Sequence, residues 1–510
     1  MNKRLVCLLL ALLMLTGCQA PIENTSVPAH TLPPAEAKHA APSGFDGLKH
    51  TATVPLFLPS RDGQRLLTEY VTLPLDHSRH SAEAIVQALL NFPGSDQAAP
   101  LSDRVTLSLY GPNPVEVTGG VCTVNLAATA LQLDVESLHR VSAAITATLC
   151  ELDDVHYVNL LVADRAVSMD ITGHLPLGSQ TARPGEELTS LWEQMDARRT
   201  PLGEKPADTP VTAVATLYFP LANGSGIVAE TRNLTFPGQD PDQLAAGLVT
   251  ALSAGAQYLS GASPMPDLST LMSAMPQTTE LDDGGRMISV YFHAGLENSL
   301  RASGVDMPCL ISALTYTLTS FIPSVTSVRI HIGNAPLTSL YSAVHGNLIF
   351  QNGLILRQQF ASYPMEQVTL YFASGDRLTK VLRPLPYHQA QSLQALLLEL
   401  IKGPTQAELD AGYEPVLPDG LDESDILGMA LEGDTLLVNL SPRCAELLRT
   451  QAASWEQVAC YSLVNTLCES IGARRMRFFF GGQMAEELGG TLYWGGEFLV
   501  NPSLIDQTLG

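Results

Sequence analysis

Internal repetition is the feature of this sequence that most constrains its fold. Apolar blocks recur three times in the same order after residue 50. The first block reads Leu-Phe-Leu at 56–58 and Leu-Tyr-Phe at both 217–219 and 370–372, and each copy runs into a polar turn and a second extended segment. A fixed order of blocks at similar spacing is typical of tandem copies of one structural unit. The sequence therefore predicts three copies of one small domain.

The remaining blocks predict the elements of each unit. A helical pattern follows the first block, and a Gly-containing turn with an apolar strand comes next. A second helix then carries apolar pairs four positions apart on one face, and an alternating strand closes the unit. The helical patterns lie at 84–90, 244–252 and 393–401, the apolar strands at 124–126, 290–292 and 438–440, the helix pairs at Ile145/Leu149, Leu314/Leu318 and Leu463/Leu467, and the closing strands at 158–162, 328–332 and 476–480.

Each unit thus reads β-α-β-β-α-β, and we expect an α+β fold. One mixed or antiparallel sheet with two helices on one face is the simplest arrangement that buries the apolar side of every element. The expected domains are 51–178, 211–361 and 362–510. Because only a few residues join the second and third copies, we expect those two to form a rigid pair.

The expected linker between the first two domains, 179–210, contains a short amphipathic pattern. Leu188, Leu191, Trp192 and Met195 lie at helical spacing, which predicts a short helix with one apolar stripe. This stripe would pack on a neighbouring copy or, alternatively, recruit another protein.

The N-terminus has the order of an export signal that ends in a lipidation site. Lys3 and Arg4 precede an apolar run at 5–15, which is shorter than the roughly 20 residues that a spanning helix needs. The run ends at Leu-Thr-Gly-Cys, residues 15–18, which resembles the lipobox of bacterial lipoproteins. That resemblance implies cleavage before Cys18 and a diacylglyceryl group on its sulfur.

We therefore expect a signal peptide at 1–17 and a Pro/Ala-rich tether at 18–50. The mature chain would be held at the extracytoplasmic face of the cell membrane by the lipid on Cys18, because two or more acyl chains anchor a protein stably. An ordinary secretory signal with a chance cysteine is the alternative.

Composition excludes several classes of protein. Apolar residues make up 45% of the 510 residues, so the bulk of the chain can bury cores and is not intrinsically disordered. The formal net charge is −23, which would repel a polyphosphate partner, and nucleic acid is not expected as a ligand. Eight cysteines are too few for a fold built on disulfides.

The usual catalytic spacings are missing from the sequence. It contains no Gly-x-Ser-x-Gly, His-Glu-x-x-His, Gly-x-x-x-x-Gly-Lys or Cys-x-x-Cys motif. His77 and His80 beside Asp76 form the closest histidine pair and have the chemistry of metal ligands, but a solvated loop before a helix is the preferred interpretation. We therefore expect no catalytic, cofactor-binding or metal-binding residues.

An acidic segment is the other candidate for a metal site. Asp419, Asp422, Glu423 and Asp425 place four carboxylates close together. Calcium loops use oxygen ligands at alternating positions with a glycine in the turn, and this spacing does not match. A solvated loop between a helix and a hairpin is the preferred interpretation.

The cysteines beyond residue 18 are interpreted as structural thiols. Cys150 and Cys468 occupy the same position of the second helix, where the middle copy has Thr319, which favours a small semi-buried side chain over a nucleophile. Cys460 and Cys468 lie about 12 Å apart along one predicted helix, too far for a bond. A Cys444–Cys460 bridge stays open as an alternative. The six residues concerned are Cys122, Cys150, Cys309, Cys444, Cys460 and Cys468.

The repeat resembles the GerMN (sporulation and spore germination) domain family. The resemblance is clearest in the third copy, at Val-Thr-Leu-Tyr-Phe (368–372), at the helix end Ile-Lys-Gly-Pro (401–404), at the loop 413–420 and at the strand 434–441. The second copy is similar at its opening strand and second helix. The first copy departs most, because Pro55 interrupts its opening strand and Phe-Pro-Gly replaces the Gly-Pro helix stop.

This resemblance implies extracytoplasmic lipoproteins of spore-forming Gram-positive bacteria, with tandem domains whose fold is similar to ring-building motifs. No catalytic residues are attributed to the family. We therefore expect a non-enzymatic, lipid-anchored assembly or scaffold protein with protein partners in a sporulation- or germination-associated envelope complex. A solute- or cell-wall-binding lipoprotein is the alternative, followed by a cell-wall hydrolase.

Overall fold

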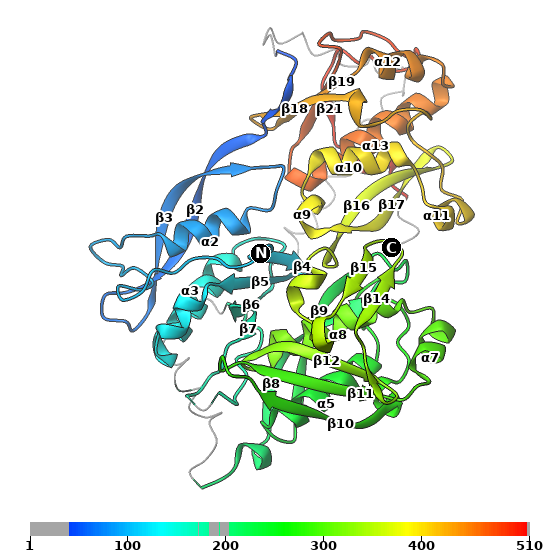
Figure 1. The fold of residues 1–510 in the computed structure, drawn as a ribbon. Coiled ribbons are helices and arrows are strands. Elements are labelled where there is room, and N and C mark those ends of the chain that lie inside the picture. Colours follow the sequence, from blue (N-terminus) through cyan, green and yellow to red (C-terminus); the bar gives the residue numbers. More distant parts are fainter. Residues whose placement is uncertain (1–39, 172, 183–192, 194–202, 507–510) are drawn as a thin grey trace, which may run out of the picture. The chain divides into compact units, whose positions relative to one another are not determined.

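The described part of the chain forms three successive units that share one order of main elements (Figure 1). The computed structural model describes residues 40–171, 173–182, 193 and 203–506. The expected signal peptide, Cys18, most of the tether and the apolar stripe of the linker lie outside these residues. Each unit consists of a hairpin, a helix, a second hairpin, a second helix and a closing strand. The predicted α+β class and the threefold repetition are confirmed.

The bounds of the elements follow the predicted blocks closely. After β1 Gly44–Gly47, the first unit contains β2 Lys49–Pro59, β3 Leu66–Asp76, α2 Ala82–Leu90, β4 Val115–Thr118, β5 Val121–Leu126, η1 Ala128–Gln132, α3 Val135–Leu149, β6 Tyr157–Val162 and β7 Arg165–Ala166. The second contains η2 Pro206–Asp208, β8 Val211–Pro220, β9 Ile227–Phe236, α5 Pro241–Ser253, α6 Leu268–Leu271, β10 Met272–Glu280, β11 Arg286–Phe292, α7 Leu296–Ser303, α8 Met307–Phe321, β12 Val325–Ile332, β13 Ala335–Pro336, β14 Ser339–Ser342, β15 Gly346–Ile349, η3 Gln351–Gly353 and η4 Arg357–Phe360. The third contains β16 Met365–Ser374, β17 Arg377–Pro386, α9 Tyr387–Ala390, α10 Leu393–Lys402, α11 Gln406–Asp410, η5 Glu423–Asp425, β18 Ile426–Glu432, β19 Thr435–Leu440, α12 Pro442–Arg449, α13 Ala453–Ile471, β20 Arg475–Phe480, β21 Phe498–Leu499 and η6 Pro502–Leu504.

The first and third units each contain two separate sheets and the second contains three, the third of these being the hairpin β14–β15, so the expectation of one sheet per unit is wrong. The opening hairpins β2–β3, β8–β9 and β16–β17 are two-stranded. The second sheets have the orders β4-β5-β6-β7, β10-β11-β12-β13 and β1-β18-β19-β20-β21. In each of these, the strand before the second helix is parallel to the strand after it.

The second helix of each unit explains why the sheets are separate. A threonine hydroxyl of this helix accepts the outward-facing N–H of the opening strand, which would otherwise bond to another strand. The three donor–acceptor pairs are Phe57 N to Thr148 Oγ1 at 3.0 Å, Tyr218 N to Thr317 Oγ1 at 3.0 Å and Tyr371 N to Thr466 Oγ1 at 3.2 Å. The same bond in all three units places the helix against the hairpin.

Pro55 does not interrupt its strand, contrary to the sequence-based interpretation. β2 runs through Pro55, which is opposite Tyr70 of β3. Phe57 directs its N–H away from β3, to Thr148, and successive amides along a strand alternate in direction. The nitrogen of Pro55 therefore also faces away from β3, and the ladder loses no hydrogen bond.

The first unit diverges from the others at the end of its first helix. In the second unit, the Arg232 guanidinium donates to Ala251 O at 3.2 Å and lies 5.0 Å from the Phe219 ring centroid. In the third unit Arg383 makes the equivalent contacts with the end of α10 and with Phe372. The strand registers place Val71 at this position in the first unit. A cation near a helix C-terminus is stabilising, and the first unit lacks it.

The cores show that the first two units are the more closely joined pair. Their buried apolar residues form one continuous cluster, whereas those of the third unit form another. The chain that leaves the first unit explains this, because Gln180 bridges to Val158 of β6 and the Ser179 N–H donates to Val214 O of β8 at 2.8 Å. The shared core therefore lies between the first and second units, and the rigid pairing expected of the second and third copies stays a prediction.

Residues 44–50, the end of the expected tether, are part of the folded structure. β1 pairs in parallel with β18, and Gly47 is opposite Ala430. Leu48 is 1% exposed and belongs to the core of the third unit. Asn439 Nδ2 also donates to Pro42 O at 2.9 Å. The segment that precedes the first unit is thus bound to the third.

Candidate functional site

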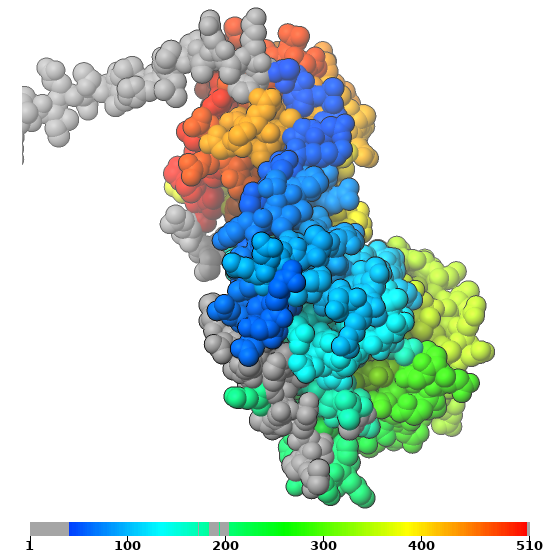
Figure 2. All heavy atoms as spheres, turned by 90° about the vertical axis from the view of Figure 1, so that its left-hand side faces the viewer, coloured from blue at the N-terminus to red at the C-terminus, as the bar shows by residue number. Residues whose placement is uncertain are grey.

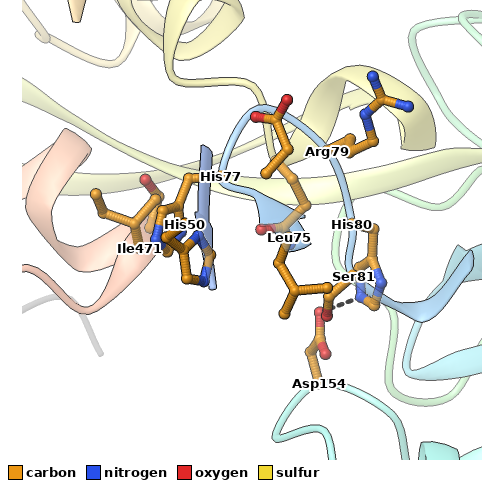
Figure 3. Close-up of a pocket in the computed structure, with 11 residues that line it drawn as sticks. His50, Leu75, His77, Arg79, His80, Ser81, Asp154 and Ile471 are labelled. Carbon is orange, nitrogen blue, oxygen red and sulfur yellow. Dashed lines mark hydrogen bonds and ion pairs between the residues drawn. The ribbon is translucent and has the colours of Figure 1, made fainter. Parts of the chain in front are cut away.

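A polar hollow of about 190 Å³ brings together the histidines singled out in the sequence. It is lined by the start of β2, by the loop between β3 and α2, and by residues of the third unit that include Gln391 and Ile471. Figure 3 shows His50 and His77 together on one side and His80 beside Asp154 on the other. The two histidines of the predicted pair therefore have different partners.

His77 stacks on His50 from the neighbouring strand. The ring centroids lie 3.9 Å apart with an interplanar angle of 11°. Burial and the neighbouring His50 lower the pKa of His77, although Asp76 opposes this shift. The backbone N–H of His77 donates to Leu48 O at 3.2 Å, so the stack lies beside the residue that enters the core of the third unit.

His80 connects the start of α2 to a turn after α3. Its Nδ1 accepts the Ala82 N–H at 3.0 Å, and its Nε2 lies 2.9 Å from Asp154 Oδ2. Because Nδ1 accepts a hydrogen bond, the proton of the neutral ring is on Nε2 and is donated to the carboxylate. Burial would raise the pKa of Asp154, but the opposing interactions, of which the hydrogen bond from His80 is the largest, outweigh it and lower that pKa.

These contacts assign structural roles to the candidate metal ligands. Asp76 accepts bonds from the backbone and hydroxyl of Ser78, at 2.9 and 2.7 Å. In the part of the chain that the structure describes, no group of three or more His, Cys, Asp or Glu side chains is arranged to hold a metal ion.

The acidic segment 419–425 is also organised by local hydrogen bonds. Asp422 caps η5 by accepting the Ser424 N–H at 2.8 Å. Asp425 is 3% exposed and accepts bonds from the Ser441 hydroxyl and from Arg443 Nη1, the latter at 3.1 Å. Glu423 accepts a bond from Gln394 of α10 at 3.0 Å. These carboxylates therefore fasten η5 to α10 and to the start of α12 and do not converge on one point.

The cysteines of the described residues are all free thiols, so Cys444 and Cys460 do not form the bridge left open by the sequence. Burial raises the pKa of Cys444 and of Cys468 to about 12 in each case. A thiol with a raised pKa holds little of the reactive thiolate at neutral pH.

A buried ionic cluster joins the first two units. Glu116 of β4 and Arg357 of η4 are 2% and 7% exposed and lie 3.4 Å apart. Arg357 also donates to Ser320 Oγ at 2.7 Å and to Tyr218 OH at 3.3 Å, and its guanidinium lies 3.7 Å from the Tyr316 ring centroid. Burial raises the pKa of Glu116 to about 7, although Arg357 and Tyr218 oppose this shift.

The space beside this cluster is too small for an organic ligand. The adjoining cavity measures about 20 Å³, which is enough for about one water molecule. Sequence reasoning missed the cluster, because Arg357 lies outside the repeated blocks. The one available signal was the charge of Glu116 within an otherwise apolar strand.

The turn between β4 and β5 contacts the second and the third unit. The Thr118 hydroxyl donates to Met365 O, and the Gly119 N–H donates to Glu366 Oε2 at 2.8 Å. A Cβ at Gly119 would lie 1.9 Å from Ala229 O, and φ there is +58°, so glycine is needed at this position. Burial raises the pKa of Glu366 to about 7, against the backbone donors that favour its ionised form.

The fold and these contacts define a class of protein: a chain of three tandem α+β domains whose buried polar groups join the domains to one another. The sporulation and spore germination (Germane) family model matches residues 55–168, 216–338 and 369–486, which together make up more than half of the chain. The chain belongs to this family. The three matches also confirm the resemblance inferred from the repeated blocks.

Solved structures similar to this chain include a putative lipoprotein from Clostridium perfringens, which is 21% identical over 26% of this chain and 87% of that chain with a TM-score of 0.19, and two structures of the sporulation protein GerM from Bacillus subtilis. The tandem GerMN domains of GerM are 17% identical over 56% of this chain and 96% of that chain, with a TM-score of 0.22. The first GerMN domain alone is 20% identical over 26% of this chain and 96% of that chain, with a TM-score of 0.21. No curated protein matches the chain.

Proposed function

We propose that the chain is a lipid-anchored, extracytoplasmic protein with a non-catalytic assembly or scaffold role in an envelope complex associated with sporulation or germination. The observation that carries this proposal is the threefold match to the sporulation and spore germination family across the folded part of the chain. Three copies of one domain multiply the surface available for protein partners.

The chemistry of the described residues supports a binding role over catalysis. The histidine, carboxylate and arginine clusters are engaged in bonds between elements and between domains. The polar hollow of about 190 Å³ is smaller than the roughly 300–1,000 Å³ typical of ligand pockets.

The anchor is supported by the order of basic residues, apolar run and lipobox in the first eighteen residues. In the structure, none of the described helices combines the length and apolar character needed to cross a membrane.

Substitution of the anchor tests the attachment to the membrane. We expect Cys18→Ala to move the protein from the membrane fraction to the soluble fraction, because the thiol that carries the lipid is lost. Cys7→Ala is the matched control, since it removes a cysteine from the apolar run and leaves the lipobox intact. Retention of the Cys18→Ala variant in membranes would contradict lipid anchoring.

Crosslinking on intact cells tests the assembly role. Photo-crosslinkers at exposed positions of the native chain, followed by mass spectrometry, should recover the same envelope proteins in repeated experiments. Turnover of peptidoglycan by the purified chain, abolished by a single substitution, would instead show a cell-wall hydrolase and overturn the proposal.

A further inference from the structure

The outer edge of β3 is an open strand edge in the first unit. The N–H of Phe57 points away from β3, and Phe57 is opposite Thr68. Phe57 and Thr68 therefore form a non-hydrogen-bonded pair of the antiparallel ladder, in which the backbone groups of the two residues point away from each other. Because this direction recurs at every second residue, the backbone groups of Thr68, Tyr70 and Thr72 point away from β2. Among the described residues, no backbone group outside β2 bonds to residues 66–75.

The equivalent strands of the other units are bonded near the start of their outer edges. In β9, the Ile227 N–H donates to Tyr363 O at 2.9 Å and the Ala229 N–H to Thr118 Oγ1 at 3.3 Å. In β17, Leu378 O accepts the Asp506 N–H at 2.8 Å. Leu66 of β3 is the counterpart of Ile227 and Leu378 in the strand registers, and it has no such bond.

Two edges of the second sheets, at β18 and at β10, are also protected. β1 covers β18. In β10, Pro276 offers no N–H, and the Thr278 N–H donates to Asp242 Oδ1 at 2.7 Å. Natural proteins cover or interrupt exposed edges because an open edge is a template for another strand. In β3, the outer edge is interrupted at Pro74, which offers no N–H and lies near the end of the strand.

The sequence of β3 is nearly symmetric about Tyr70. It reads Leu67-Thr68-Glu69-Tyr70-Val71-Thr72-Leu73. Its even-numbered side chains face solvent, and Tyr70 is 72% exposed. Figure 2 shows the hairpin, in blue, at the surface on this side of the molecule. A strand whose residues match about a central position can pair with its own copy across a twofold axis.

The charge of this face allows a second copy to approach it. The net charge of −23 makes two copies repel one another over most of their surfaces. The exposed side chains of the two strands carry no carboxylate: they are Lys49, Thr51, Thr53, Thr68, Tyr70, Thr72 and Pro74. The exposed carboxylate of Asp62 lies in the turn that joins the strands. Two copies can therefore approach closely through this face.

We propose that β3 pairs antiparallel with β3 of a second copy, with the twofold axis at Tyr70, so that the two hairpins form one four-stranded sheet. Thr68 of each copy is then opposite Thr72 of the other, and the two Tyr70 side chains lie side by side. Thr68, Tyr70 and Thr72 of each copy would each donate one backbone hydrogen bond to the other copy and accept one from it. Threonine and aromatic pairs of this kind stabilise antiparallel sheets.

The test is the oligomeric state of the full chain extracted from membranes in detergent, measured by sedimentation velocity over a range of concentrations. The native chain should form dimers. Tyr70→Lys should raise the dimer dissociation constant at least about tenfold, because two ammonium groups meet at the axis. Thr53→Lys is the matched control, since it adds the same charge to the same face on β2 and should leave the dimer intact.

Disulfide trapping gives an independent measurement on intact cells. Tyr70→Cys should give a disulfide-linked dimer and Thr53→Cys should not, because residues paired across the axis have Cα atoms about 5.5 Å apart, within disulfide range. Circular dichroism of both variants confirms that they fold. A monomeric native chain, a dimer unaffected by Tyr70→Lys, or crosslinking of Tyr70→Cys to a different protein or to a segment of its own chain would overturn the proposal.

Discussion

At the scale of single residues, the buried pair Glu116–Arg357 is a feature whose stability depends on both partners being present. Both side chains are nearly inaccessible to water, so each depends on the other and on neutral donors such as Tyr218 and Ser320. A buried charge that loses its partner is strongly destabilising, whereas loss of both charges costs much less.

Removal of one charge should therefore lower the free energy of unfolding more than removal of both. We expect Arg357→Met to lower the free energy of unfolding by about 3–5 kcal/mol, as measured by urea unfolding followed by circular dichroism. The double variant Glu116→Gln/Arg357→Met should lose less unfolding free energy than Arg357→Met alone. Equal losses in the two variants would show that packing, and not the unpaired carboxylate, determines the effect.

Glu366 predicts a dependence of stability on pH. Its pKa rises from 4.5 to about 7 in the folded protein, so the folded state holds this proton more tightly than the unfolded state. Its contribution is therefore fully present below about pH 4.5 and is lost as the pH rises through about 7.

Thermal unfolding between pH 4.5 and 8 measures this effect. Glu366→Gln should flatten the pH dependence in this range, since the group no longer titrates. Glu151→Gln, at an exposed position, is the control. An unchanged profile for Glu366→Gln would assign the pH dependence to other groups, of which Glu116 is the first to test.

At the scale of elements, the bond between the second helix and the opening strand is repeated in every unit. Thr317→Val keeps the shape of the side chain and leaves the buried Tyr218 N–H without its acceptor. We expect a loss of about 1–3 kcal/mol in unfolding free energy, measured by urea unfolding. Thr250→Val is the control, because this exposed hydroxyl bonds within its own helix; an equal loss there would contradict a specific role for Thr317.

Most elements could be predicted from the sequence because their apolar periodicity is local. The helix end at Gly403 was visible as a Gly-Pro pair, and φ there is +75°. The separation of the two sheets was not visible, since it depends on hydroxyls such as Thr148 that contact residues far away in the sequence. The Glu116–Arg357 pair was hidden for the same reason. The Cys18 anchor remains a prediction.

At the scale of the whole molecule, close backbone contact fixes β1 on the third unit. A Cβ on Gly47 would lie 2.3 Å from Ala430 Cβ, so we expect Gly47→Ala to displace β1 from β18. Hydrogen exchange should then become faster at the amides of β18. Gly295→Ala is the control, because a Cβ there meets nothing within 4 Å and φ is −74°. Unchanged exchange in the Gly47→Ala variant would show that the pairing tolerates a side chain.

The pairing of β1 with β18 has a mechanical consequence. The peptide chain enters the first unit only after passing over the third, where Leu48 is buried. A pull on the N-terminal segment would therefore strain the β1–β18 hydrogen bonds before it reached β2. The domain farthest from the N-terminus in sequence would be the first to bear the load.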